Sequence, residues 1–345
     1  MGSILDIEIQ SNFNQLLTWF LSEKSNYIDK EEPWNISLFA INISNLYKKL
    51  PVVRRNLKQT NISVKLLSDD EYLAEDGEYL RPIIRLKEYV HKNLTEYVCD
   101  FLIHGSIATM DYSKGWSDLD TLVIVNDETL LDPQKLIAFR MKIIDAYNFL
   151  LQMDVHQHHG FIFCSEAGLK QYYSHFMPLE VISKSKSLLS DNDIAISHNR
   201  SVKCALNSFK QKNNLLYSAY LNKVLKHHKY KNDYLCENFK NPNTMYQLKY
   251  FLSVVMTLPT YYLDAKGEPC YKKDSFEIVK NEFKDEWEII EKATKIRKIW
   301  PSKELHPYVG NLIPNWVIDI LGREYFYRAY RLSNAMLNSL TNVKV

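Results

Sequence analysis

The chain has 345 residues, 46% of them hydrophobic, and a formal net charge of +2. Its length favours two domains, and its near-neutral charge does not indicate a nucleic-acid partner, although a local basic groove stays an alternative. Nine glycines and eleven prolines exclude a low-complexity or linker-dominated architecture.

The sequence contains no recognisable targeting or membrane-spanning segment. The first ten residues lack the basic region and apolar core of a signal peptide, and no apolar run reaches 18 residues. The five cysteines form no C-x-x-C pair, so a structural zinc site is not indicated, and their odd, scattered set fits a reducing compartment. We therefore expect a cytoplasmic protein without a membrane partner; its oligomeric state is not indicated.

The first 94 residues predict mainly helices. Apolar residues recur at helical spacing in residues 4–22, 36–50 and 80–92, and a polar, mixed stretch separates the last two helices at 52–77. We expect this part of the chain to pack as a helical extension against the domain that follows.

The segment 101–126 carries the residues with the clearest chemistry. An apolar run predicts a short buried strand before Gly105 and Ser106, and Asp118 and Asp120 open a second apolar strand. Alternate residues of a strand face the same way, so the two carboxylates project side by side. Neighbouring carboxylates stay ionised together most readily around a cation, and a Gly-Ser turn can offer backbone N–H groups to phosphate.

The sequence has Gly105-Ser106, eleven further residues and then Asp-x-Asp in an apolar strand. This arrangement resembles the motif of the DNA polymerase β-type nucleotidyltransferase superfamily. The resemblance implies an α+β fold with a mixed sheet flanked by helices. The nucleotidyltransferase domain would span 95–199, after an N-terminal helical extension at 1–94 and before a helical C-terminal domain at 200–345.

The resemblance also implies an activity and a set of roles. The enzyme would move a nucleoside monophosphate from a nucleoside triphosphate to a hydroxyl group, whose owner and preferred base the sequence does not give. Asp118 and Asp120 would hold two Mg²⁺ or Mn²⁺ ions. Gly105 would allow close approach of the triphosphate, while Ser106 and Ser117 would bind its oxygens.

A long helix and a third strand are predicted next. Asp132 and Pro133 are a good N-cap and first helical residue, and residues 154–164 read as a strand. The resemblance implies a third carboxylate on this strand, and Asp154 is the acidic residue available there as metal ligand and base. With a different register His158 would occupy that place instead. Three histidines in this stretch could assist at the metal or phosphate site: His156, His158 and His159.

The remainder of the chain predicts an edge strand at 193–197 and then a helical domain. Within that domain we expect Pro259 to kink or end one helix and Pro301 to stop another. The superfamily often supplies a lysine and a serine from this domain to the triphosphate. By that resemblance the nucleotide-binding candidates are Lys249, Lys273 and Ser275.

Two alternatives remain open at this point. The uncertain third carboxylate is compatible with a non-catalytic nucleotide-binding or regulatory protein on the same fold. An RNA-directed terminal nucleotidyltransferase or oligonucleotide synthase would need a basic groove beside the carboxylates. Clusters such as Lys48-Lys49 and Arg54-Arg55 could supply that groove or lie on a solvated surface.

Overall fold

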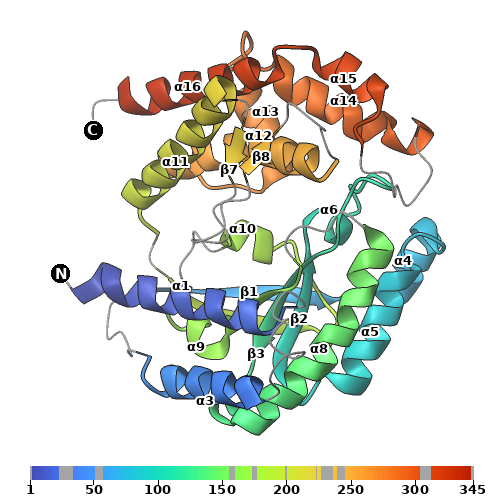
Figure 1. Ribbon diagram of the computed structural model, residues 1–345, viewed down its shortest axis with the longest axis vertical. Helices are drawn as coiled ribbons and strands as arrows, with labels where there is room; N and C mark the ends of the chain where they lie inside the picture. The colour runs from blue at the N-terminus through green and yellow to red at the C-terminus, as the bar shows by residue number, and fades with distance from the viewer. Residues whose placement is uncertain are drawn as a thin grey trace. The chain divides into compact units, whose positions relative to one another are not determined.

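A computed structural model of the chain describes residues 2–22, 34–50, 57–154, 160–172, 177–198, 200–222, 224–226, 236–238, 245–303 and 312–342. The chain divides into two compact units, residues 1–200 and 201–345 (Figure 1). The two units are described separately below.

The first unit is built on a six-stranded mixed sheet with the strand order β4-β3-β2-β5-β1-β6. The strands are β1 (Lys58–Leu66), β2 (Val98–His104), β3 (Asp120–Val125), β4 (Ile162–Ser165), β5 (Lys186–Ser187) and β6 (Asn192–His198). β3 pairs with β4 and β1 with β5 in parallel, whereas the pairs β2–β3, β2–β5 and β1–β6 are antiparallel. The predicted α+β class with a mixed sheet between helices is therefore confirmed.

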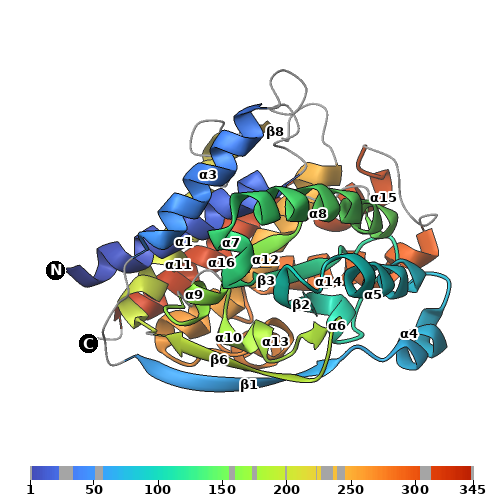
Figure 2. The same cartoon turned by 90° about the horizontal axis from the view of Figure 1, so that it is seen from below.

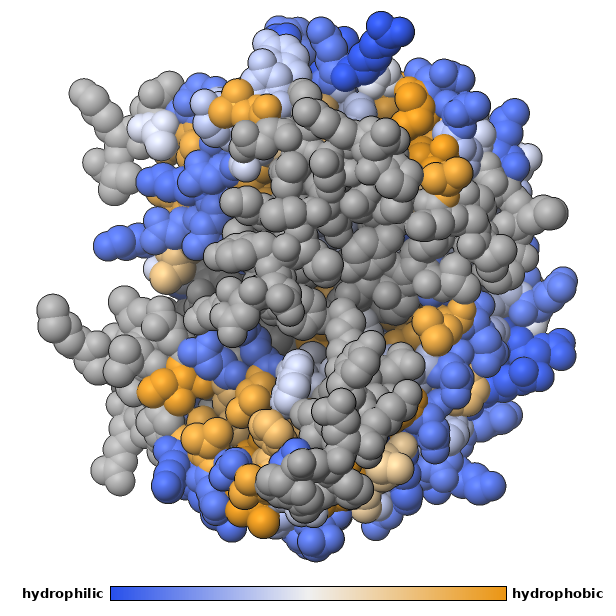
Figure 3. Space-filling model, viewed as in Figure 1, coloured by the Kyte–Doolittle hydropathy of each residue, from blue (hydrophilic) through white to orange (hydrophobic). Residues whose placement is uncertain are grey.

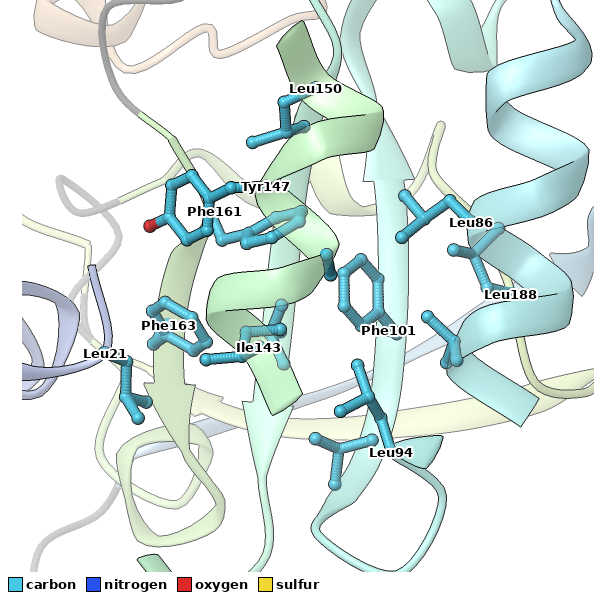
Figure 4. Close-up of a cluster of buried hydrophobic side chains, with 14 of the residues drawn as sticks. Leu21, Leu86, Leu94, Phe101, Ile143, Tyr147, Leu150, Phe161, Phe163 and Leu188 are labelled. Carbon is cyan, nitrogen blue, oxygen red and sulfur yellow. The ribbon is translucent and has the colours of Figure 1, made fainter. Parts of the chain in front are cut away.

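One face of this sheet carries the larger hydrophobic core. The helices that contribute to it are α1 (Gly2–Phe20), α3 (Trp34–Lys48), α5 (Arg81–Asn93) and α8 (Pro133–Met153). Figure 4 shows α8 lying over the sheet, with Ile143 and Tyr147 of the helix near Phe161 and Phe163. The α8 helix starts where the sequence predicts, because Asp132 accepts a hydrogen bond from the N–H of Gln134 at 2.8 Å.

The opposite face carries a second core that includes Leu102, Leu122 and Ile124. It also takes residues from α9 (Glu166–Leu169) and α10 (Leu179–Ile182). Figure 2 shows β1 and β6 running side by side beside these elements. The remaining short helices of the unit are α4 (Asp69–Asp76), α6 (Gly105–Ala108) and α7 (Asp127–Leu131).

Three strand predictions need correction. β1 lies in the stretch 52–77, where no strand was predicted, so the N-terminal part supplies a strand of the main sheet as well as helices. β3 begins at Asp120, so Asp118 precedes the strand. The third strand was predicted from residue 154, but β4 starts only at Ile162.

The second unit consists mainly of helices. They are α11 (Val202–Asn222), α12 (Met245–Lys266), α13 (Lys272–Lys280), α14 (Glu288–Lys303), α15 (Asn315–Leu321) and α16 (Tyr325–Asn342), with a small antiparallel pair β7 (Val224–Lys226) and β8 (Cys236–Asn238). α12 continues through Pro259 and α14 through Pro301, so neither proline ends its helix as predicted. Packing explains this result, because Leu258 and Trp300 beside them are fully buried.

The surface of the first unit exposes an apolar stripe on α3. Leu38, Ile41 and Leu46 are 47%, 44% and 47% exposed. Hydrophobic side chains gather over this helix in the lower part of Figure 3. None of the helices in the described part of the chain combines the length and the apolar character needed to cross a bilayer.

Candidate functional site

The candidate site begins where β2 ends and β3 starts. These strands are antiparallel neighbours, and His104 lies opposite Asp120 in the register. Gly105 follows at once with φ of +72°, a conformation that residues with a Cβ rarely adopt. A Cβ added to Gly105 would collide with Asp120 Oδ2 and lie 3.3 Å from Asp120 Cγ. The carboxylate of Asp120 therefore lies directly against the backbone of Gly105, which only glycine permits.

Asp118 and Asp120 flank a buried leucine at the start of β3. Leu119 between them is fully buried in the core beneath α8, whereas both aspartates are partly exposed. Asp120 continues the alternation of Leu122 and Ile124, which belong to the opposite core, so it lies on the face away from α8. Asp118 lies before the strand, and its facing the same way as Asp120 stays a prediction.

The two serines predicted at the site are in direct contact. The Ser106 hydroxyl donates to Ser117 Oγ at 3.1 Å, and the N–H of Ser113 donates to the same oxygen at 2.9 Å. Ser117 is buried and Ser106 is half-buried. The first turn of α6 and the loop that leads to Asp118 are therefore joined through one hydroxyl group.

Asp154 is not on the third strand as predicted. It follows α8 as the C-cap residue, with its N–H bonded to Leu150 O at 3.0 Å, and its side chain is buried. The helical sequence continues through Met153, which leaves Asp154 at the helix end. The predicted histidines at 156, 158 and 159 lie outside the described residues.

Asp154 nevertheless lies in the neighbourhood of Asp118, as Tyr79 reveals. Burial raises the pKa of Tyr79 above its ordinary value, and the negative charges of Asp154 and Asp118 raise it further. Both carboxylates are consequently within electrostatic reach of one phenol. The end of α8 and the loop before β3 are therefore both close enough to influence this side chain.

Tyr79, Asp76 and their contacts with the loop were not predicted from the sequence. The Tyr79 hydroxyl donates to Ser117 O at 3.3 Å, and Asp76 forms an ion pair with Lys114. Although burial raises the pKa of Asp76, Lys114 and the N–H of Tyr79 lower it below its ordinary value overall. These contacts join positions about 38 residues apart, which no local pattern could have revealed.

The candidates in the helical part of the chain belong to the second unit. Lys249 is buried on α12, and Lys273 is exposed on α13. Ser275 is fully buried, and its hydroxyl donates to Lys272 O at 2.6 Å and contacts Thr260 Oγ1 at 3.3 Å. The Ser275 hydroxyl is thus hydrogen-bonded within the interior of its own unit.

The donors at the site suit a hard cation. Among the residues that the structure describes, no group of three or more His, Cys, Asp or Glu side chains is arranged to hold a metal ion. Mg²⁺ usually takes one or two carboxylates, and water and substrate phosphates supply the remaining ligands. Asp118 and Asp120 match that requirement, and the missing Cβ of Gly105 makes room for the Asp120 carboxylate itself.

The comparisons with known proteins add no relative. No protein-family model matches the chain. No curated protein and no solved structure matches it either.

Proposed function

We propose that this protein is a Mg²⁺-dependent nucleotidyltransferase that moves a nucleoside monophosphate from a nucleoside triphosphate to a hydroxyl acceptor. The observation that carries the proposal is the contact of the Asp120 carboxylate with Gly105, where Ser106 follows the glycine and Asp118 lies two positions before Asp120. An acidic pair and a glycine turn at the meeting point of two strands combine a cation site with an approach for phosphate.

The chain's residues would take the following roles. Asp118 and Asp120 hold the metal ion, which supplies Lewis-acid neutralisation of the phosphate oxygens when bound. Gly105 lets the triphosphate approach the backbone, and Ser106 offers its backbone N–H to a phosphate oxygen, since its hydroxyl group is bonded to Ser117. Asp154 accepts the proton of the acceptor hydroxyl as the general base.

The reaction is a displacement at the α-phosphorus. The acceptor oxygen forms a bond to this phosphorus, its bond to the bridging oxygen breaks, and pyrophosphate leaves with the electron pair. The acceptor proton passes to a base. The engaged hydroxyl of Ser275 argues for a structural role in its own unit.

The test is pyrophosphate release from labelled nucleoside triphosphates with Mg²⁺ and a panel of hydroxyl acceptors. Replacing Asp118 and Asp120 by Asn should lower turnover at least about a thousandfold, since metal stabilisation contributes several kcal/mol. Asp127→Asn, at the other end of β3, is the matched control and should turn over like the unaltered protein. Equal turnover by all three proteins would refute the proposal.

A second candidate is a non-catalytic nucleotide-binding protein on the same fold. The position of Asp154 favours it, because the expected third carboxylate ends a helix instead of lying on the neighbouring strand. Calorimetry with a nucleoside triphosphate and Mg²⁺ separates the two candidates. Binding without turnover for every acceptor supports the second, and turnover with any acceptor removes it.

A further inference from the structure

The turn between α4 and α5 holds the loop that precedes Asp118 at two points. Asp76, the last residue of α4, forms the ion pair with Lys114. Three residues later, Tyr79 reaches Ser117, the residue directly before Asp118. The N–H of Tyr79 also donates to Asp76 Oδ1 at 3.2 Å, so the two anchors brace one another.

Of the two anchors, Tyr79 contacts the loop at the position nearer to Asp118 in the chain. Its hydroxyl donates to Ser117 O and accepts a hydrogen bond from the N–H of Gly115. Its ring is buried and stacks on Tyr112, with centroids 5.3 Å apart and planes inclined by 22°. A single rigid side chain therefore ties two backbone groups and one ring of the loop together.

This arrangement fixes the peptide that leads into the acidic pair. Ser117 is buried, so its carbonyl group needs a partner inside the protein. The partner it has lies within electrostatic reach of both Asp118 and Asp154. A change at Tyr79 would thus release the loop at the residue directly before the Asp118 carboxylate.

We propose that Tyr79 is a positioning residue for the acidic pair, holding the Ser117–Asp118 peptide so that Asp118 is aimed at the cation beside Asp120. This proposal rests on the proposed function, because it assigns a purpose to the geometry of Asp118. It also gives the N-terminal part of the chain a role at the site beyond packing, through the α4–α5 turn.

The test measures Mn²⁺ binding without nucleotide, from the electron paramagnetic resonance signal of the free ion. Tyr79→Phe keeps the ring but loses the hydroxyl group, and it should weaken Mn²⁺ binding about tenfold, the usual effect of removing a supporting hydrogen bond. Tyr89→Phe is the matched control, because the Tyr89 hydroxyl donates to Lys142 O at 2.8 Å on α8, away from the site. It should lose comparable stability in thermal unfolding and bind Mn²⁺ as the unaltered protein does.

Two further variants keep the outcomes separate. Lys114→Met removes the other anchor through a partly exposed side chain, so folding is not at stake, and it should weaken Mn²⁺ binding several-fold. If Asp118→Asn abolishes Mn²⁺ binding while Tyr79→Phe and Lys114→Met bind normally, the positioning role is overturned and the proposed function stands. If the unaltered protein binds no Mn²⁺, the metal-dependent function fails, and this role fails with it.

Discussion

Strand β3 has acidic residues at both ends, and the fold treats the two ends differently. At the C-terminal end, Asp127 accepts a hydrogen bond from the Tyr47 hydroxyl, and Lys170 lies 3.9 Å from Asp127 and 3.5 Å from Glu166. At the N-terminal end, Asp120 lies against Gly105, and serines connect the adjoining loop. Acidic residues near each other therefore do not define a site by themselves. A lysine accompanies the carboxylates at one end, and a glycine lies against a carboxylate at the other.

Among changes that leave the acidic pair in place, the largest effect should come from adding a methyl group at Gly105, at the N-terminal end. Gly105→Ala places a methyl group against Asp120 Oδ2, and displacing a reacting group by about 1 Å can cost about a hundredfold in rate. Nucleotide turnover measures the effect. Gly267→Ala is the control, because its φ of +83° carries the same backbone strain of about 1–2 kcal/mol while its Cβ meets only Val202 Cγ2 at 3.4 Å. Equal turnover by the two variants would mean that the close contact between Gly105 and the Asp120 carboxylate has no functional role.

A smaller effect, on stability alone, is expected at the C-terminal end. Tyr47→Phe removes the hydrogen bond to Asp127 and the one accepted from the N–H of Ala167 at 3.4 Å. Unfolding in urea should show a loss of about 1–2 kcal/mol, with turnover unchanged. A large fall in turnover at unchanged stability would instead make this end the functional one.

The smallest effect concerns Asp100, which faces the second core from β2. Burial raises its pKa, while hydrogen bonds from the Ser187 hydroxyl at 2.6 Å and the N–H of Phe101 oppose the rise. Because the folded pKa exceeds the unfolded one, this group's stabilising contribution is complete below the unfolded pKa of about 3.9 and is lost as pH rises through the folded value.

Asp100→Asn keeps an acceptor for both hydrogen bonds and removes the titration. The melting temperature of the variant should therefore fall less than that of the unaltered protein as pH rises above about 4. Asp193→Asn is the control, since Asp193 also accepts from a serine hydroxyl, that of Ser63, but lies exposed on β6. A steeper fall for Asp100→Asn than for the unaltered protein would contradict the assignment.

The parts of the fold that the sequence predicted correctly are those encoded locally. The strand before Gly105 and the apolar run after Asp120 are continuous buried segments, and their separation is short enough to read directly. The helix after Asp132 carries its own capping signal.

The parts that were missed depend on partners far along the chain. In β1 only Ile62 and Val64 are buried, so its sequence resembles a polar loop until β5 and β6 pair with it. Asp154 is the C-cap residue of α8 and lies eight positions before β4 begins at Ile162, so it is not on the third strand. The contact of Tyr79 with Ser117 spans 38 positions and leaves no periodic trace.

The most direct test of the central claim is a crystal structure of the protein with Mg²⁺ and a non-hydrolysable nucleoside triphosphate. The account predicts a metal ion about 2.0–2.1 Å from carboxylate oxygens of Asp118 and Asp120, with the triphosphate passing the backbone of Gly105. A nucleotide bound elsewhere, or a metal ion held by other residues with these two carboxylates turned away from it, would contradict the account.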